Sequence, residues 1–199
     1  WIFVVPASGS FTSVASSMTV TGGTLDLGNS TMSVRRVWSH TGGVVRGAQG
    51  RAVFEGTAAQ SVALLPGSSF AAFVASNTVG VTITSSLTAT AQLEWHRGGL
   101  NFAGRALSVG GNMTIFPGAG ALTFAGSTVT FAGASTQTIG FPALDAVVVD
   151  NPSPVRLALD STWGNFTINP GRYFDGFLRT LTVTGEQWSS AGAVYGGVQ

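Results

Sequence analysis

Eight carboxylates are the side chains of this 199-residue chain that could do acid–base chemistry. They are Asp26, Glu55, Glu94, Asp145, Asp150, Asp160, Asp175 and Glu186. Cleavage of a glycosidic bond needs a paired acid and base, usually two carboxyl groups held close together. No two of these acids are adjacent or form an Asp-x-Asp motif, although residues one turn apart in a repeating fold could still meet. The sequence therefore predicts no catalytic residue, and a polysaccharide lyase or hydrolase stays the alternative.

Two histidines are the next candidates, because imidazole is a common metal ligand. His40 and His96 each lie just after a tryptophan and shortly before a Gly-Gly pair, in WSHTGG and WHRGG. A metal site needs further histidine or carboxylate ligands within reach, and the spacing implies none. The chain has no cysteine, which removes disulfides, thiolate metal sites and cysteine nucleophiles. We therefore expect no metal and no cofactor, and interpret both histidines as polar corner residues.

Three tryptophans could form a sugar-stacking surface if their rings faced outward: Trp38, Trp95 and Trp163. Apolar residues alternate with polar ones around Trp38 and Trp95, which places both rings at core-like positions. The pattern therefore favours packing of these rings over binding of a ligand.

Threonines recur two residues apart, and Thr128, Thr130, Thr136 and Thr138 are the candidate exposed ligand surface. Regular rows of outward threonines are how some ice-binding proteins order water. The Thr-x-Thr pairs of this chain are irregularly spaced, which disfavours a two-dimensional array. Ice binding is therefore the least favoured of the alternatives.

The composition excludes several classes of partner. Only 9% of residues are charged, the formal net charge is +1, and all nine basic residues are arginines. Arg35 and Arg36 are the only adjacent pair of arginines, so the sequence offers no basic patch for nucleic acid. No apolar run reaches the roughly 18 residues of a membrane span, so we expect no membrane insertion. Hydrophobic residues make up 44% of the chain, which argues against disorder.

The stretch 118–144 carries the clearest secondary-structure signal. Its candidate core residues are Leu122, Phe124, Val129, Phe131 and Ile139, and small or hydroxyl residues stand between them. Alternation with a period of two indicates short strands with one buried face, and glycines close each run. The same alternation predicts further inward residues along the chain: Val20, Leu25, Leu27, Met32, Val34, Trp38, Val45, Val53, Val62, Leu64, Phe70, Phe73, Val79, Val81, Ile83, Val147, Val149, Val155, Leu157, Leu159, Phe166 and Ile168.

A long repeat relates distant parts of the chain. Val34, Val109 and Val183 end similar strands, with spacings of 75 (109 − 34) and 74 (183 − 109) residues. Gln60 and Gln137 lie 77 residues apart (137 − 60) in similar contexts. These anchors predict long repeats near 23–97, 98–170 and, in part, 171–199.

Glycine-containing turns reveal a shorter period inside the long one. They recur at Gly23, Gly43, Gly99, Gly118 and Gly171, with gaps of 20, 56, 19 and 53 residues. Gaps near 19 and near three times 19 predict a coil of about 19 residues, four of which fill one long repeat. Stacked coils would form parallel sheets about 4.8 Å per rise around one shared core.

The sequence therefore predicts an all-β fold, a right-handed parallel β-helix (β-solenoid) of about ten coils of roughly 19 residues. Right-handed winding is expected by analogy with parallel crossover connections. We expect residues 1–199 to form a single domain and to be part of a longer chain.

Two segments carry a family resemblance. The run from Phe131-Ala132-Gly133 to Gln137-Thr138-Ile139, continued by Phe141 and Leu144, resembles the β-solenoid repeats of bacterial secreted and cell-surface proteins. So does GGTLDLGNSTMSV. This group includes filamentous-haemagglutinin-like adhesins and autotransporter passengers. The resemblance implies a β-helix that serves as a stalk, adhesin or filament body at an extracellular or cell-surface location.

The functional expectation is a non-enzymatic structural or adhesive rod of an exported bacterial protein. Terminal coils of a solenoid have unpaired strand edges, which must be capped or paired. We expect these edges to pair with flanking coils or with other copies of the chain, giving a filament. Cell-surface glycans are a further expected partner, and a carbohydrate-binding module is an alternative function.

Overall fold

The structure is a computed structural model that describes residues 2–4, 12–102 and 104–195. Every element that it describes is a β-strand. None of the described residues belongs to a helix that is long and apolar enough to span a membrane. The strands are β1 (Ile2–Val4), β2 (Thr12–Asp26), β3 (Thr31–Arg46), β4 (Arg51–Gly56), β5 (Gln60–Val62), β6 (Phe70–Ile83), β7 (Leu87–Asn101), β8 (Ala106–Val109), β9 (Met113–Ile115), β10 (Ala119–Thr123), β11 (Thr128–Phe131), β12 (Gln137–Gly140), β13 (Ala143–Val149), β14 (Val155–Leu157), β15 (Ser161–Ile168), β16 (Tyr173–Asp175), β17 (Leu181–Val183), β18 (Trp188–Ser190) and β19 (Ala193–Tyr195).

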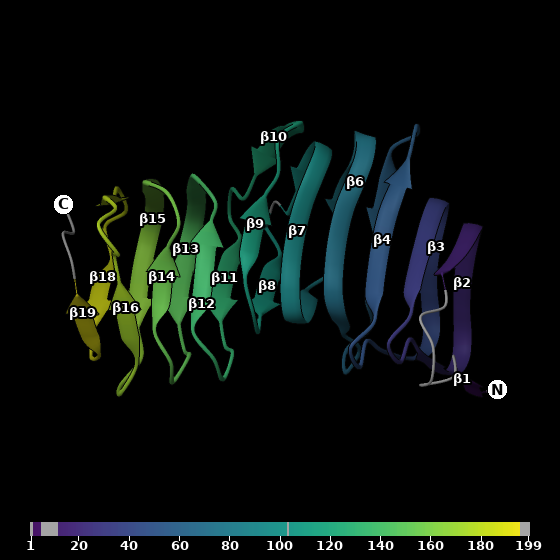
Figure 1. Cartoon of the computed structure of the whole chain (residues 1–199), viewed down its shortest axis with the longest axis horizontal. Coiled ribbons are helices and arrows are strands. Elements are labelled where there is room, and N and C mark those ends of the chain that lie inside the picture. The colour runs from purple at the N-terminus through teal and green to yellow at the C-terminus, as the bar shows by residue number, and fades with distance from the viewer. Residues whose placement is uncertain (1, 5–11, 103, 196–199) are drawn as a thin grey trace.

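Parallel pairing joins each strand to strands about one turn away in sequence. Thr128 on β11, for example, pairs with Ala106 on β8 and with Ala146 on β13, 22 and 18 residues away (128 − 106 and 146 − 128). The strands stack along the long axis of the molecule from β1 to β19 (Figure 1). The fold is thus a parallel β-solenoid of about nine turns, close to the ten expected, while right-handed winding stays a prediction.

The coils are less uniform than a 19-residue period implies. Ile139 on β12 pairs with Met113 on β9, an offset of 26 residues (139 − 113). The extra residues include β10, which leaves the stack and pairs with the end of β7 through Ala119 and Gly98 (Figure 1). A sequence period averages over such an insertion, so it cannot reveal it.

The longest strands turn corners where glycines stack. Gly43 in β3 has a positive φ of 80°, as does Gly23 in the coil before it at 71°. A Cβ on Gly43 would lie 2.5 Å from the Gly23 carbonyl oxygen. Only a residue without a side chain fits such close backbone packing at left-handed dihedrals. Glycine therefore fixes this corner of successive coils.

One continuous core runs through the coils. Most residues predicted to point inward are buried in it: Val20, Leu25, Leu27, Met32, Val34, Trp38, Val45, Val62, Leu64, Phe70, Phe73, Val81, Ile83, Phe124, Val129, Phe131, Ile139, Val147, Val149, Val155, Leu157, Phe166 and Ile168. Leu122 is half-buried and packs against this core from β10. Like residues stack in register, since Phe131 pairs with Val109 and Val149 in the neighbouring coils.

Three inward assignments are wrong. Val79 is 56% exposed, because the ladder between β6 and β7 shifts register between Ser76 and Gly80 and the chain bends there. Val53 is half-buried, because its strand buries the neighbouring Ala52 and Phe54 instead. Leu159 is half-buried, since β14 ends at Leu157 and the chain turns. Alternation fails wherever a bend or a small buried residue changes its phase.

Candidate functional surfaces

A buried amide pair holds one corner of the solenoid. The Gln60 side chain donates from Nε2 to the Val34 carbonyl oxygen at 2.8 Å. Asn77 donates from Nδ2 to Gln60 Oε1 at 2.8 Å and to the Ala58 carbonyl oxygen at 2.7 Å. Gln60 and Asn77 are almost fully buried. The pair therefore joins three successive coils and satisfies polar groups that would otherwise be unpaired in the core.

The same pair occurs again in the second half of the chain. Gln137 donates to the Val109 carbonyl oxygen at 2.9 Å and to the Gly111 carbonyl oxygen at 2.6 Å. Asn151 donates to Gln137 Oε1 at 2.6 Å and to the Ser135 carbonyl oxygen at 2.8 Å. The two glutamines that anchored the long repeat in the sequence therefore have equivalent partners. Their role in the structure is packing, with no free polar atom aimed at a ligand.

Arginine–carboxylate pairs connect neighbouring coils on the outer surface. Three of them have distances of 3.1 Å: Arg35 with Glu55, Arg156 with Asp175, and Arg172 with Asp150. Hydrogen bonds from Asn169 and Arg172 lower the pKa of Asp150 below its usual value of 3.8. These acids are held by cations of the same chain, and none of these pairs brings two carboxylates together.

Glu94 is the centre of the densest polar cluster. Arg51 contacts both carboxylate oxygens of Glu94, at 3.1 and 2.8 Å. Gln92 donates to the same carboxylate at 2.6 Å, and His96 lies 2.8 Å from Oε2. Burial raises the pKa of Glu94, but hydrogen bonds from His96 and Arg51 outweigh that effect and lower the pKa below its usual value of 4.5.

The Glu94 cluster reaches over two coils. Arg51 lies on β4 and Glu94 on β7, with β6 between these strands. Ala72 and Val74 of β6 are nearly fully buried, although their strand neighbours also fill the core. The ion pair thus bridges β6, and its side chains are engaged with one another. That arrangement suits a structural clamp.

The other acids lie at turns. Asp26 accepts a hydrogen bond from the Gly28 amide at 2.9 Å, and Asp160 accepts one from the Thr180 amide at 2.8 Å. Asp145 accepts one from the Gly126 amide at 2.5 Å. Each stabilises a turn in its own or a neighbouring coil.

The two histidines have local partners. His40 is buried, its Nδ1 accepts from the Leu65 amide at 3.2 Å, and its Nε2 is 3.3 Å from the Gly43 carbonyl oxygen. His96 stacks on Phe116 with ring centroids 4.0 Å apart. In the part of the chain that the structure describes, no three histidine, cysteine or acidic side chains lie close enough to hold a metal ion.

The three candidate sugar-stacking tryptophans face the core. Trp38, Trp95 and Trp163 are at most 5% exposed. Trp38 Nε1 donates to the Ala63 carbonyl oxygen, and Trp95 Nε1 donates to the Gly98 carbonyl oxygen, each at 2.8 Å. None of the three offers a ring face to a ligand.

The candidate threonine surface is divided between two exposures. Thr136 and Thr138 are exposed, whereas Thr128 and Thr130 are half-buried between neighbouring coils. Thr130 pairs with Ser108 on one side and with Val148 on the other. The outer row thus mixes hydroxyl and aliphatic side chains and is not a uniform threonine rank.

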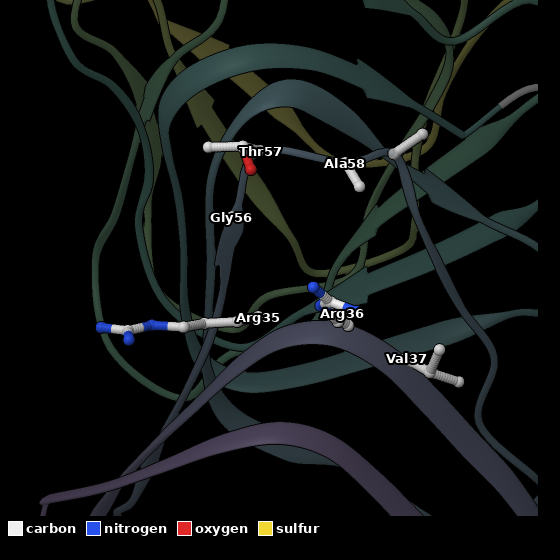
Figure 2. A pocket seen from close by; sticks show the side chains of 7 residues that line it. Arg35, Arg36, Val37, Gly56, Thr57 and Ala58 are labelled. Carbon is white, nitrogen blue, oxygen red and sulfur yellow. The ribbon is translucent and has the colours of Figure 1, made fainter.

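Two further surfaces escaped the sequence reasoning. The first is an open groove of about 690 Å³ lined by residues 35–37 and 56–59 (Figure 2). Its only sequence signal was the adjacent pair Arg35-Arg36. The second is the edge formed by β17, β18 and β19, which within the described residues pair on one side only. Trp188 and Tyr195 on this edge are 45% and 59% exposed.

Comparison of the chain with models of known protein families, with curated proteins and with solved structures gives no match. The geometry of the chain itself is therefore the basis for a functional proposal.

Proposed function

We propose that this chain is a structural or adhesive rod of an exported bacterial protein, located at the cell surface. The observation that carries the proposal is the continuity of the stack. A single core extends from Val20 to Leu181, and parallel ladders join the coils along it. At about 4.8 Å per rise, nine turns make a rod of roughly 43 Å.

The side chains between coils add to this continuity. The Gln60 and Gln137 amide networks and the Arg51–Glu94 pair each link more than two neighbouring coils. A solenoid derives its stability from such nearest-neighbour contacts. A rod held at every step is suited to bear load or to hold an adhesive surface away from a cell.

The open edge supplies the assembly step of the proposal. An unpaired row of backbone groups on β18 and β19 is a template for another parallel strand. A second copy that stacks on this edge would also cover Trp188 and Tyr195. Such a head-to-tail contact does not close on itself, so it extends into a filament.

Sedimentation velocity of the 199-residue chain tests the assembly step. We expect the average mass to rise with concentration. Ser189→Lys, on the exposed β18 edge, should suppress that rise, because a lysine on an edge opposes pairing. Thr138→Lys is the matched control, since Thr138 is equally exposed but lies on β12, which is paired on both sides.

A monomer at every concentration would contradict assembly through this edge, as would equal effects of the two lysine variants. Protease treatment of intact cells tests the location separately. The protein should be cleaved on cells whose cytoplasmic proteins survive.

A further inference from the structure

A break in the ladder between β3 and β4 creates the groove near Arg36. Pairing of these strands ends at Val34 and Phe54, and no residue of β4 pairs with Arg35, Arg36 or Val37. The chain then leaves β4 at Gly56, and residues 57–59 form the facing wall (Figure 2). The groove is therefore a gap between two coils.

A β-bulge places Arg36 in this gap. Ala15 pairs with Val34 and Ser17 pairs with Val37, so two steps on β2 face three steps on β3. Such bulges re-aim side chains and are common beside functional sites. Figure 2 shows the Arg36 side chain extending into the space below Thr57 and Ala58, whereas Arg35 extends away from it.

Charge in the groove is concentrated on Arg36. Arg35 is engaged by Glu55 at 3.1 Å. Among the described residues, no ion pair or side-chain hydrogen bond reaches the Arg36 guanidinium. An arginine fork can bind a carboxylate through two parallel hydrogen bonds. Arg36 is therefore available for an anionic group.

The facing wall is held in place from the next coil. Asn77 donates to the Ala58 carbonyl oxygen at 2.7 Å, and the Thr78 hydroxyl donates to the Gly56 carbonyl oxygen at 3.0 Å. Because Asn77 is fully buried, this wall is ordered before any ligand arrives. Preorganisation of this kind reduces the entropy lost on binding.

The equivalent corner of the second half lacks these features. Gly110 stands where Arg35 does, because a Cβ on Gly133 would meet the Gly110 carbonyl oxygen at 2.1 Å, as one on Gly56 would meet that of Arg35 at 2.3 Å. The next residue there is Gly111, whose carbonyl oxygen is filled by Gln137. The corner thus forms without arginines, so folding does not explain Arg36.

We propose that this groove binds a small carboxylate whose body is apolar, such as an aromatic or branched aliphatic acid. Arg36 binds the carboxylate, and the body lies against Val37, Ala58 and Ala59. Val37 is 55% exposed and gives an apolar contact. Thr57 is the only neutral polar side chain in the lining, which is too few hydrogen-bonding groups for a sugar. A single guanidinium also suits a carboxylate better than a phosphate, which usually takes more donors.

Titration of the 199-residue chain with phenylacetate tests this site by NMR of the arginine Nε–Hε groups. Phenylacetamide is the matched neutral ligand, and galacturonate is the matched polar acid. We expect a dissociation constant of roughly millimolar order for phenylacetate, with the Arg36 signal shifting. Phenylacetamide and galacturonate should bind at least tenfold more weakly.

Arg36→Gln should weaken phenylacetate binding about tenfold or more, because it removes a charge-assisted pair. Arg105→Gln is the control, since Arg105 is another exposed arginine that forms no ion pair among the described residues. Circular dichroism should be unchanged in both variants. Equal loss in the two variants, or equal binding of galacturonate and phenylacetate, would mean attraction by charge alone and would overturn the proposal. Absence of any binding would also overturn it.

Discussion

At the scale of single residues, buried amides hold this solenoid together more specifically than its apolar side chains do. Gln60 with Asn77, and Gln137 with Asn151, place two amide groups in the core and satisfy them with carbonyl oxygens of other coils. A half-satisfied network of this kind costs more than an apolar one. Loss of one member should therefore be felt strongly.

Gln137→Leu tests the amide network. It leaves Asn151 and two carbonyl oxygens without their partner, so we expect a loss of about 2–4 kcal/mol in the free energy of unfolding. Urea denaturation measures it. Gln187→Leu, at an exposed position, should change the same free energy by less than about 0.5 kcal/mol. If the two variants were equally stable, the network would have no structural weight.

Glu94→Gln tests the clamp over β6 through its pH dependence. The folded-state pKa of Glu94 lies below its usual value of 4.5. The ionised carboxylate therefore stabilises the fold above pH 4.5, and this stability is lost as the pH falls through the folded-state pKa. Wild type should be more stable than the variant at pH 7, and the difference should narrow below pH 4.5.

Glu186→Gln is the control for Glu94, because Glu186 is exposed and forms no ion pair among the described residues. Thermal unfolding between pH 3 and pH 7 should show no such narrowing there. A difference between wild type and Glu94→Gln that stays constant with pH would contradict the clamp.

At the scale of the elements, the coil is shaped by where backbones of successive turns come close. Gly43 and Gly67 have the same positive φ of 80°, but only Gly43 faces another backbone. A Cβ at Gly67 would meet nothing within 4 Å. The two glycines therefore separate the cost of a left-handed dihedral from the cost of a clash.

Gly67→Ala should lower the free energy of unfolding by about 1–2 kcal/mol, the usual cost of a left-handed residue. Gly43→Ala should cost clearly more, because its methyl group also displaces the Gly23 backbone. Chemical denaturation of the two variants measures the difference. Equal losses would mean that the stacked corner has room to relax.

Much of the element pattern could be predicted from the sequence. Short alternating runs between glycines indicated strands, and equivalent residues such as Gln60 and Gln137 gave the repeat, because each coil meets similar neighbours. The excursion of β10 and the bend at Val79 could not be predicted, since both depend on pairing between coils. The Arg36 groove was missed for the same reason, because a bulge is a property of two strands.

At the scale of the whole molecule, few charges and one continuous core describe a rod rather than a container of a deep site. The charged residues mostly pair across coils, and the apolar ones stack along the axis. The exposed aromatic rings of Trp188 and Tyr195 gather at one edge of the stack. That distribution suits growth along the axis, which is the central claim of the proposed function.

Electron microscopy of the protein isolated from its own cells tests that claim most directly. We expect slender unbranched filaments whose diffraction contains a layer line near 4.8 Å along the axis, the spacing of stacked parallel strands. Compact particles without that layer line would contradict the account.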